Sequence, residues 1–138
     1  MTFLSPDAEA LAQLNKTDMS KPVGMLNMLK FHVQAQYGAV TSEPPATGAE
    51  AYGRYSAGVA KIFSRTGASV SLAGDIALIG PQGEWDRVFV VRYPERRMLF
   101  DLFSDPEYQK ISHHRQAALS DSRLFVLEWI DGGTTPGA

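Results

Sequence analysis

Cysteine is absent from this sequence of 138 residues. Its absence excludes a disulfide framework, a thiolate metal site and a cysteine nucleophile. A basic excess is absent too, because 13 lysines and arginines stand against 15 acidic residues and the formal net charge is -2. Such a chain has no broad positive surface for nucleic acid or for an anionic membrane. We therefore expect neither nucleic acid nor a membrane among its partners.

Long apolar runs are also missing, and residues 1–16 lack the basic and apolar regions of a secretory signal. The composition, 44% hydrophobic and 20% charged, is typical of one globular domain. We expect a cytoplasmic protein with a single domain over residues 1–138. Its core should cover about residues 21–130, preceded by a helical extension at 1–20 and followed by a flexible tail at 131–138.

Four segments have the pattern of a helix: residues 6–14, 47–67, 95–103 and 106–119. In the first, Ser5 is a plausible cap and Pro6 takes the first helical position. The second begins with a Thr47–Glu50 capping box, and Gly67 supplies a left-handed stop. These local signals predict where the second helix begins and ends.

Four other segments favour strands, because apolar, β-branched and aromatic residues dominate them: residues 21–33, 68–80, 85–94 and 122–130. Residues 34–47, with Gly38 and the pair Pro44-Pro45, are typical of a long surface loop. The resulting order is a helix followed by β-α-β-β-α-β. It predicts an α+β fold of the ferredoxin-like type, a four-stranded antiparallel sheet with helices on one face.

The strand sequences LFVLEWI and VFVV are apolar at both alternating positions. Both faces of the sheet therefore need cover, and the chain has no further element large enough to cover the second one. Packing of two such sheets face to face in a homodimer would cover it.

Several stretches together resemble one family: KPVGMLNMLKF, GAEAYGRYSAGV, EWDRVFVVRYP and DPEYQKISHHRQAALSDSRLFVLE. They are similar to the domain-of-unknown-function 1330 family of the dimeric α/β-barrel superfamily, over about residues 21–130. The resemblance implies a ferredoxin-like protomer that pairs into a barrel, with a pocket between sheet and helices. Relatives in the superfamily include cofactor-independent monooxygenases, muconolactone isomerase-like enzymes, haem-binding proteins and members without known activity, so the fold does not select a function.

The helix at 106–119 carries three candidate catalytic or metal-binding residues. At about 100° per residue, Arg115 falls inside the apolar stripe, His114 lies on its flank and His113 points almost the opposite way. We therefore expect the two histidines not to act as a pair. Adjacent residues diverge on a helix, and no metal motif is present, so we predict no metal site and no cofactor.

Arg115 needs a partner, because an unpaired buried guanidinium costs several kcal/mol. One alternative is an ion pair, for which Asp86, Asp101 and Glu128 are candidates. The other is recognition of a carboxylate or an enolate oxygen of a ligand. His114, with a pKa near neutrality, is either an acid or base beside the ligand or an ordinary core or surface histidine.

Other polar residues are candidate ligand contacts. Asn27 interrupts the apolar face of its strand and is either a satisfied amide or a hydrogen-bond donor to a ligand. Tyr52 and Tyr55 lie on the inward stripe of their helix, as core residues or as phenols in a pocket. Asp86 and Arg92 share a strand face, and each is expected to find a partner on a neighbouring strand.

No nucleophile triad, phosphate loop or dinucleotide motif is present, so proton transfer and electrostatic stabilisation are the available chemistry. We predict a protein that binds a small anionic organic compound. It is either a cofactor-independent isomerase, lyase or monooxygenase or a non-catalytic binding module. In an enzyme, Arg115 and Asn27 would stabilise an oxyanion and His114 would move a proton.

Overall fold

The computed structural model of the chain describes residues 4, 6–39, 42–73 and 78–130. The predicted tail at 131–138 and the predicted cap Ser5 lie outside these residues. Within them, none of the helices is both long and apolar enough to cross a membrane.

Four antiparallel strands form one sheet: β1 (Val23–Phe31), β2 (Ser69–Leu72), β3 (Arg87–Tyr93) and β4 (Leu119–Glu128). Their order in the sheet is β2-β3-β1-β4, so the two central strands are β1 and β3. This order confirms the predicted ferredoxin-like arrangement. The predicted strand bounds differ in detail: β2 ends at Leu72 rather than at residue 80, and β4 begins at Leu119, directly after a helix.

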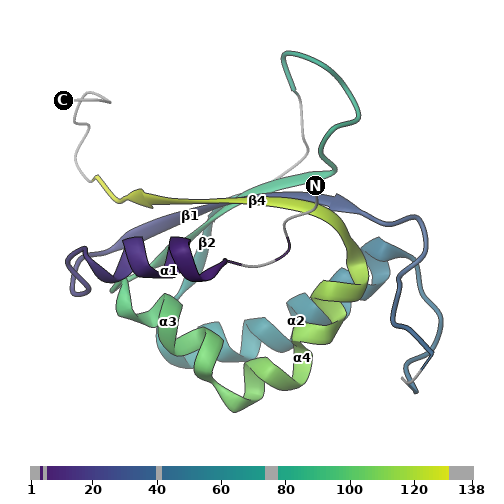
Figure 1. Cartoon of the computed structure of the whole chain (residues 1–138), viewed down its shortest axis with the longest axis horizontal. Helices are drawn as coiled ribbons and strands as arrows, with labels where there is room; N and C mark the ends of the chain where they lie inside the picture. Colours follow the sequence, from purple (N-terminus) through teal and green to yellow (C-terminus); the bar gives the residue numbers. More distant parts are fainter. Residues whose placement is uncertain (1–3, 5, 40–41, 74–77, 131–138) are drawn as a thin grey trace.

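Four helices of the described residues accompany the sheet: α1 (Ala8–Asn15), α2 (Gly48–Thr66), α3 (Arg97–Ser104) and α4 (Pro106–Ala118). All four lie on the same side of it, with α2 and α4 side by side (Figure 1). The first helix begins later than predicted, because the Asp7 carboxylate, 2.8 Å from the amide of Ala10, provides the cap.

The predicted capping box of α2 is confirmed. The Thr47 hydroxyl accepts a hydrogen bond from the amide of Glu50 at 3.1 Å, and the Glu50 carboxylate accepts one from the amide of Thr47 at 2.9 Å. Gly67 ends the helix with φ of 87°, a backbone conformation that favours glycine. These two ends fix the position of α2, which carries Tyr52 and Tyr55 over the sheet.

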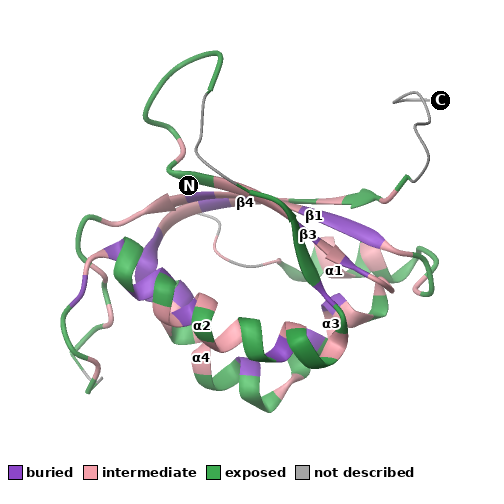
Figure 2. Ribbon diagram, turned by 180° about the vertical axis from the view of Figure 1, so that it is seen from behind, coloured by how far each residue is buried: buried purple, intermediate pink, exposed green. Residues whose placement is uncertain are grey.

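The core lies between the sheet and the helices, where Figure 2 shows the buried residues. Alternate residues of each strand face it, among them Met25, Asn27 and Leu29 of β1 and Val91 and Tyr93 of β3. The intervening residues lie on the opposite face of the sheet. That face carries an apolar set, here called the outer patch: Leu26, Met28, Val88, Val90, Phe125 and Leu127.

Candidate functional site

A cavity of about 530 Å³ lies between the inner face of the sheet and helices α2, α3 and α4. Its size is in the range of small-molecule sites in proteins. Aromatic and aliphatic side chains form most of its wall, including Met25, Tyr52, Tyr55, Val59, Phe63, Phe89, Val91, Tyr93, Leu99 and Phe103. We call it the inner cavity.

Charge in the wall of the inner cavity has one sign. Two arginines, Arg115 and Arg87, are among the described residues that line it, whereas none of these described residues is aspartate or glutamate. The remaining polar groups of the wall are uncharged at neutral pH, such as the Asn27 amide and the tyrosine phenols. The wall as described is therefore complementary to an anion with an apolar body.

Arg115 is placed by α4 with only 7% of its surface exposed. Its Nη1 donates a hydrogen bond to the backbone carbonyl of Leu4. Its Nη2 is buried and has no hydrogen-bond partner among the described residues. Arg115 forms no ion pair with Asp86, Asp101, Glu128 or any other described carboxylate, so the first of the two alternatives is not found among the described residues.

Asn27 and Arg115, two of the predicted site residues, both line the inner cavity. Asn27 is 7% exposed, and its Nδ2 donates a hydrogen bond to the backbone carbonyl of Met25 at 3.0 Å. This bond holds the amide against its own strand. The amide thus takes a fixed position on the sheet floor of the cavity.

The phenols of α2 also reach the inner cavity. Burial raises the pKa of Tyr52 to about 12, although the charges of Arg115 and Arg87 lower it. Burial likewise raises the pKa of Tyr55 well above its ordinary value. The Tyr55 hydroxyl donates a hydrogen bond to the Tyr108 hydroxyl at 3.2 Å. Both phenols of α2 therefore stay neutral at physiological pH and keep their protons for hydrogen bonding.

Arg87 is a cavity residue that was not among the sequence-based predictions. Its guanidinium lies 5.0 Å from the ring centre of Phe31 and 5.7 Å from that of Tyr52. Unlike Arg115, it is exposed. Arg87 lies two positions before Phe89 and four before Val91, so all three side chains point to the same face of β3. This alternation is the signal that could have placed Arg87 on the inner face.

His114 does not line the inner cavity, so the predicted group of Arg115, Asn27 and His114 is not brought together. The His114 side chain is 12% exposed, and a hydrogen bond of 2.7 Å joins its Nδ1 to the Tyr37 hydroxyl. Burial lowers the pKa of His114, and the charge of His113 lowers it further, while Glu43 acts in the opposite direction. The ring belongs to a different set of residues.

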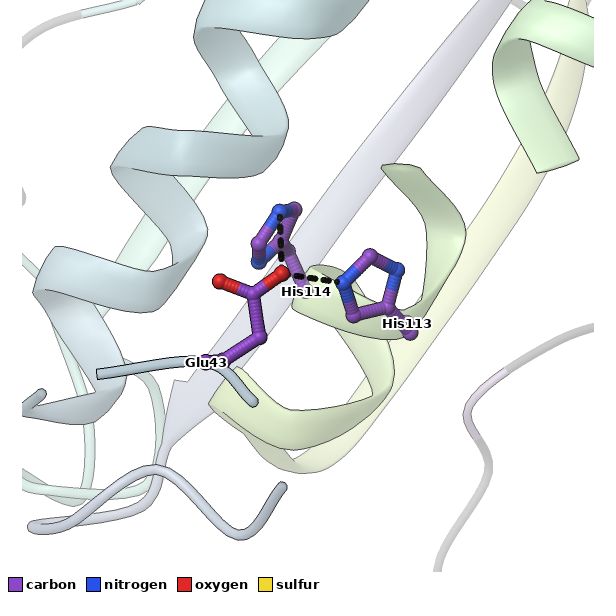
Figure 3. A group of neighbouring side chains, drawn as sticks. All are labelled: Glu43, His113 and His114. Atoms are coloured by element: carbon purple, nitrogen blue, oxygen red, sulfur yellow. Dashed lines mark hydrogen bonds and ion pairs between the residues drawn. The ribbon is translucent and has the colours of Figure 1, made fainter. Parts of the chain in front are cut away.

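That set contains both histidines of α4, which contradicts the expectation that they diverge. Their ring centres are 4.1 Å apart. Figure 3 shows both rings turned toward the carboxylate of Glu43, whose Oε1 lies 2.9 Å from Nε2 of His113 and 3.8 Å from Nε2 of His114. The hydrogen bond with His113 lowers the pKa of Glu43. Backbone positions diverge by about 100°, but side-chain torsions bring the two rings together on one acceptor.

Asp86 and Arg92 are also placed away from the inner cavity, contrary to the predicted ligand contact. Arg92 is on the opposite face of the sheet from Val91 and Tyr93, and its guanidinium lies 5.4 Å from the ring of Trp129. Asp86 accepts a hydrogen bond from the amide of Phe31 at 2.8 Å and lies 3.5 Å from Nζ of Lys30. Asp86 thus contacts β1, a neighbouring strand, as expected from the sequence, whereas the ring near Arg92 follows β4, which does not pair with β3.

Comparison with known proteins shows the family of this chain. A family model described as Domain of unknown function (DUF1330) matches residues 40–129. The chain belongs to this family. None of the curated proteins matches it in sequence.

Solved structures of proteins of unknown or hypothetical function are similar to this chain. The chain is 33% identical to a protein of unknown function from Rhodopseudomonas palustris, with a TM-score of 0.82 over 96% of this chain and 100% of that chain. A hypothetical protein from Arabidopsis thaliana shares 10% identity, with a TM-score of 0.52 over 86% of this chain and 96% of the other. A protein of unknown function from Bacteroides fragilis, described as dimeric and of ferredoxin-like fold, shares 7% identity over 78% of this chain and 96% of its own, with a TM-score of 0.50.

The DUF1330 match includes α2, β3 and α4, which carry Tyr52, Arg87 and Arg115, but it begins after β1 and therefore after Asn27. Glu43 falls inside the match, in the segment between β1 and α2. The match thus includes Tyr52, Arg87 and Arg115 of the inner cavity as well as Glu43, and it attaches no function to either set.

Proposed function

We propose that this protein binds a small organic compound with an apolar body and one anionic group in the inner cavity. The observation that supports this most strongly is Arg115, a buried guanidinium whose Nη2 lacks a partner among the described residues. A buried charge without a counter-charge is costly, and an anionic ligand would supply both the charge and the missing acceptor. The apolar wall would take up the body of the compound.

Binding is the function that this geometry supports better than the predicted proton transfer. Oxyanion stabilisation by Arg115 and Asn27 fits the wall of the inner cavity. Proton transfer was assigned to His114, which does not line it. A cofactor-independent enzyme would therefore need another group, such as a neutral phenol of Tyr52 or Tyr55, to exchange a proton with the ligand.

A comparison of acids with their amides tests this function. Benzoate, phenylacetate and cinnamate would each be titrated against the purified protein by calorimetry, beside benzamide, phenylacetamide and cinnamamide. At least one acid is expected to bind about tenfold or more tightly than its amide, because only the acid pairs with Arg115. If every amide matches its acid, anion recognition is refuted. Native mass spectrometry of the same preparation would show whether a compound co-purifies.

We further propose a homodimer that forms through the outer patch. Phe125 and Leu127 are 50% and 48% exposed on a face that no described helix covers (Figure 1). Exposed apolar patches on soluble proteins mark binding sites, among them contacts between protein subunits. The Bacteroides fragilis protein with the same type of fold is described as dimeric, which supports a dimer here without indicating the surface through which it forms.

Phe125→Glu should convert the dimer to a monomer, because a carboxylate in the outer patch would be buried at the subunit contact without a partner. Size-exclusion chromatography with light scattering at micromolar concentration measures the mass. Ile79→Glu is the matched control, since Ile79 is fully exposed and lies outside the outer patch. A wild-type protein that is a monomer would contradict the proposal, as would equal behaviour of the two variants.

A further inference from the structure

We propose that Glu43, His113 and His114 form a binding site for a divalent transition metal ion of the Zn²⁺ type, independent of the inner cavity. One oxygen of Glu43 and one ring nitrogen of each histidine lie within 4.8 Å of one another. Two imidazoles and a carboxylate are a ligand set that suits Zn²⁺ and its neighbours in the first transition row. Figure 3 shows the three side chains converging from α4 and from the segment before α2.

The spacing of the ligand atoms agrees with metal coordination. Bonds of about 2.0–2.2 Å from zinc to nitrogen and oxygen, at tetrahedral angles, place neighbouring ligand atoms about 3.3–3.5 Å apart. Here Oε1 of Glu43 lies 2.9 Å from Nε2 of His113 and 3.8 Å from Nε2 of His114. These two distances bracket the required value, so side-chain shifts of less than about 1 Å would accommodate the ion.

A second layer of contacts holds the ligands in place. The Tyr37 hydroxyl lies 2.7 Å from Nδ1 of His114, which leaves Nε2 of that ring as the atom directed at Glu43. Nη1 of Arg54 donates hydrogen bonds at 3.0 Å to the Tyr37 hydroxyl and to the carbonyl of Pro44, the residue that follows Glu43. Metal-binding histidines in proteins usually have such a partner on the second ring nitrogen, because it fixes the tautomer and the ring orientation.

The site is open to an incoming ion. The side chains of His113 and Glu43 are 45% and 28% exposed, whereas that of His114 is 12% exposed. Nη1 of Arg54 lies 4.0 Å from Oε2 of Glu43, whereas both imidazoles approach Oε1. Three protein ligands leave at least one coordination position for water or for an added ligand.

Titration of the untagged, metal-free protein with ZnCl₂ by calorimetry tests the site, with CoCl₂ as a spectroscopic probe. We expect one Zn²⁺ per chain, and visible Co²⁺ bands of a four-coordinate site that Zn²⁺ abolishes. His113→Ala and Glu43→Gln should each weaken Zn²⁺ binding by about tenfold or more, since even the loss of an outer partner has an effect of 10–100-fold. Circular dichroism would confirm that the His113→Ala and Glu43→Gln variants are folded.

His32→Ala is the matched control, because His32 is the remaining histidine of the chain and is outside the cluster. It should bind Zn²⁺ as tightly as the wild type. Absence of Zn²⁺ binding by the wild-type protein would show that Glu43 and the histidines are only an ion-pair cluster, and would overturn the proposal. So would an equal loss of affinity in His32→Ala and His113→Ala, which would place the metal elsewhere.

Discussion

Arg115→Met is expected to abolish the preference for acids over amides in the inner cavity and, at the same time, to stabilise the ligand-free protein. The two effects have one cause. In the absence of ligand, the guanidinium is 7% exposed and its Nη2 has no partner among the described residues. Replacing a poorly paired buried charge by an apolar side chain of similar length removes a desolvation cost, which in other proteins has given up to about 4 kcal/mol of added stability.

The gain should be smaller here, because the variant also loses the hydrogen bond from Nη1 to the carbonyl of Leu4. A hydrogen bond to a charged group contributes about 1.5–3 kcal/mol. We therefore expect the free energy of unfolding to rise by about 1–2 kcal/mol at most. Urea denaturation of ligand-free wild type and variant would measure it.

The free energy of acid binding that Arg115→Met loses should be larger than the free energy of unfolding that it gains. Truncating one member of a buried charge pair costs about 2–5 kcal/mol, which corresponds to a loss of roughly 30-fold to several thousandfold in affinity for the acid. The amide, which does not pair with the guanidinium, should bind almost as before. Calorimetry with phenylacetate and phenylacetamide, or with the pair that the wild type binds best, would separate the two.

Arg87→Met is the matched control for this variant, since Arg87 also lines the inner cavity but is exposed. Its charge is screened by water, so its removal should reduce acid binding by only a fewfold. Two results would contradict the assignment of Arg115. One is a folded Arg115→Met protein that still prefers acids, and the other is a larger effect of Arg87→Met than of Arg115→Met.

The sequence predicted the fold well because its decisive signals are local. The capping box of Thr47 and Glu50, the stop at Gly67 and the order of strands and helices are each contained in a few consecutive residues. The inward position of Arg115 followed from helical geometry alone. Such features do not depend on how distant segments meet.

The candidate sites were harder to predict because they depend on register and on loops. Alternation puts Arg87 and Arg92 on opposite faces of β3, and the pairing of Asn27 with Phe89 then shows that Arg87 shares the face of Asn27. Glu43 lies in an irregular segment, where no periodicity shows which way a side chain points. Because the sequence does not reveal the position of Glu43, it gives no sign that His113 and His114 contact the same group.

The start of α2 depends on a glycine that no sequence pattern singles out. A Cβ added at Gly48 would overlap the carbonyl oxygen of His32 and lie 2.8 Å from the carbonyl oxygen of Ala118. Both are backbone atoms, at the end of β1 and at the junction of α4 with β4, so neither yields by a side-chain rotation. The amide of Gly48 also donates a hydrogen bond to His32 at 3.1 Å. The close approach anchors α2 to the sheet.

Gly48→Ala is therefore expected to lower the free energy of unfolding by about 3 kcal/mol or more, at the upper end of the cost of overpacking. The helix would have to move away from β1 to relieve the overlap, and Tyr52 and Tyr55 would move with it. Gly53→Ala is the matched control in the same helix, because its added Cβ meets nothing within 4 Å. It should raise stability by about 0.5–1 kcal/mol through helix propensity. Urea denaturation of the two variants should thus give shifts of opposite sign. Equal shifts would mean that the start of α2 tolerates displacement, and that the position of the α2 phenols in the inner cavity is not fixed by this contact.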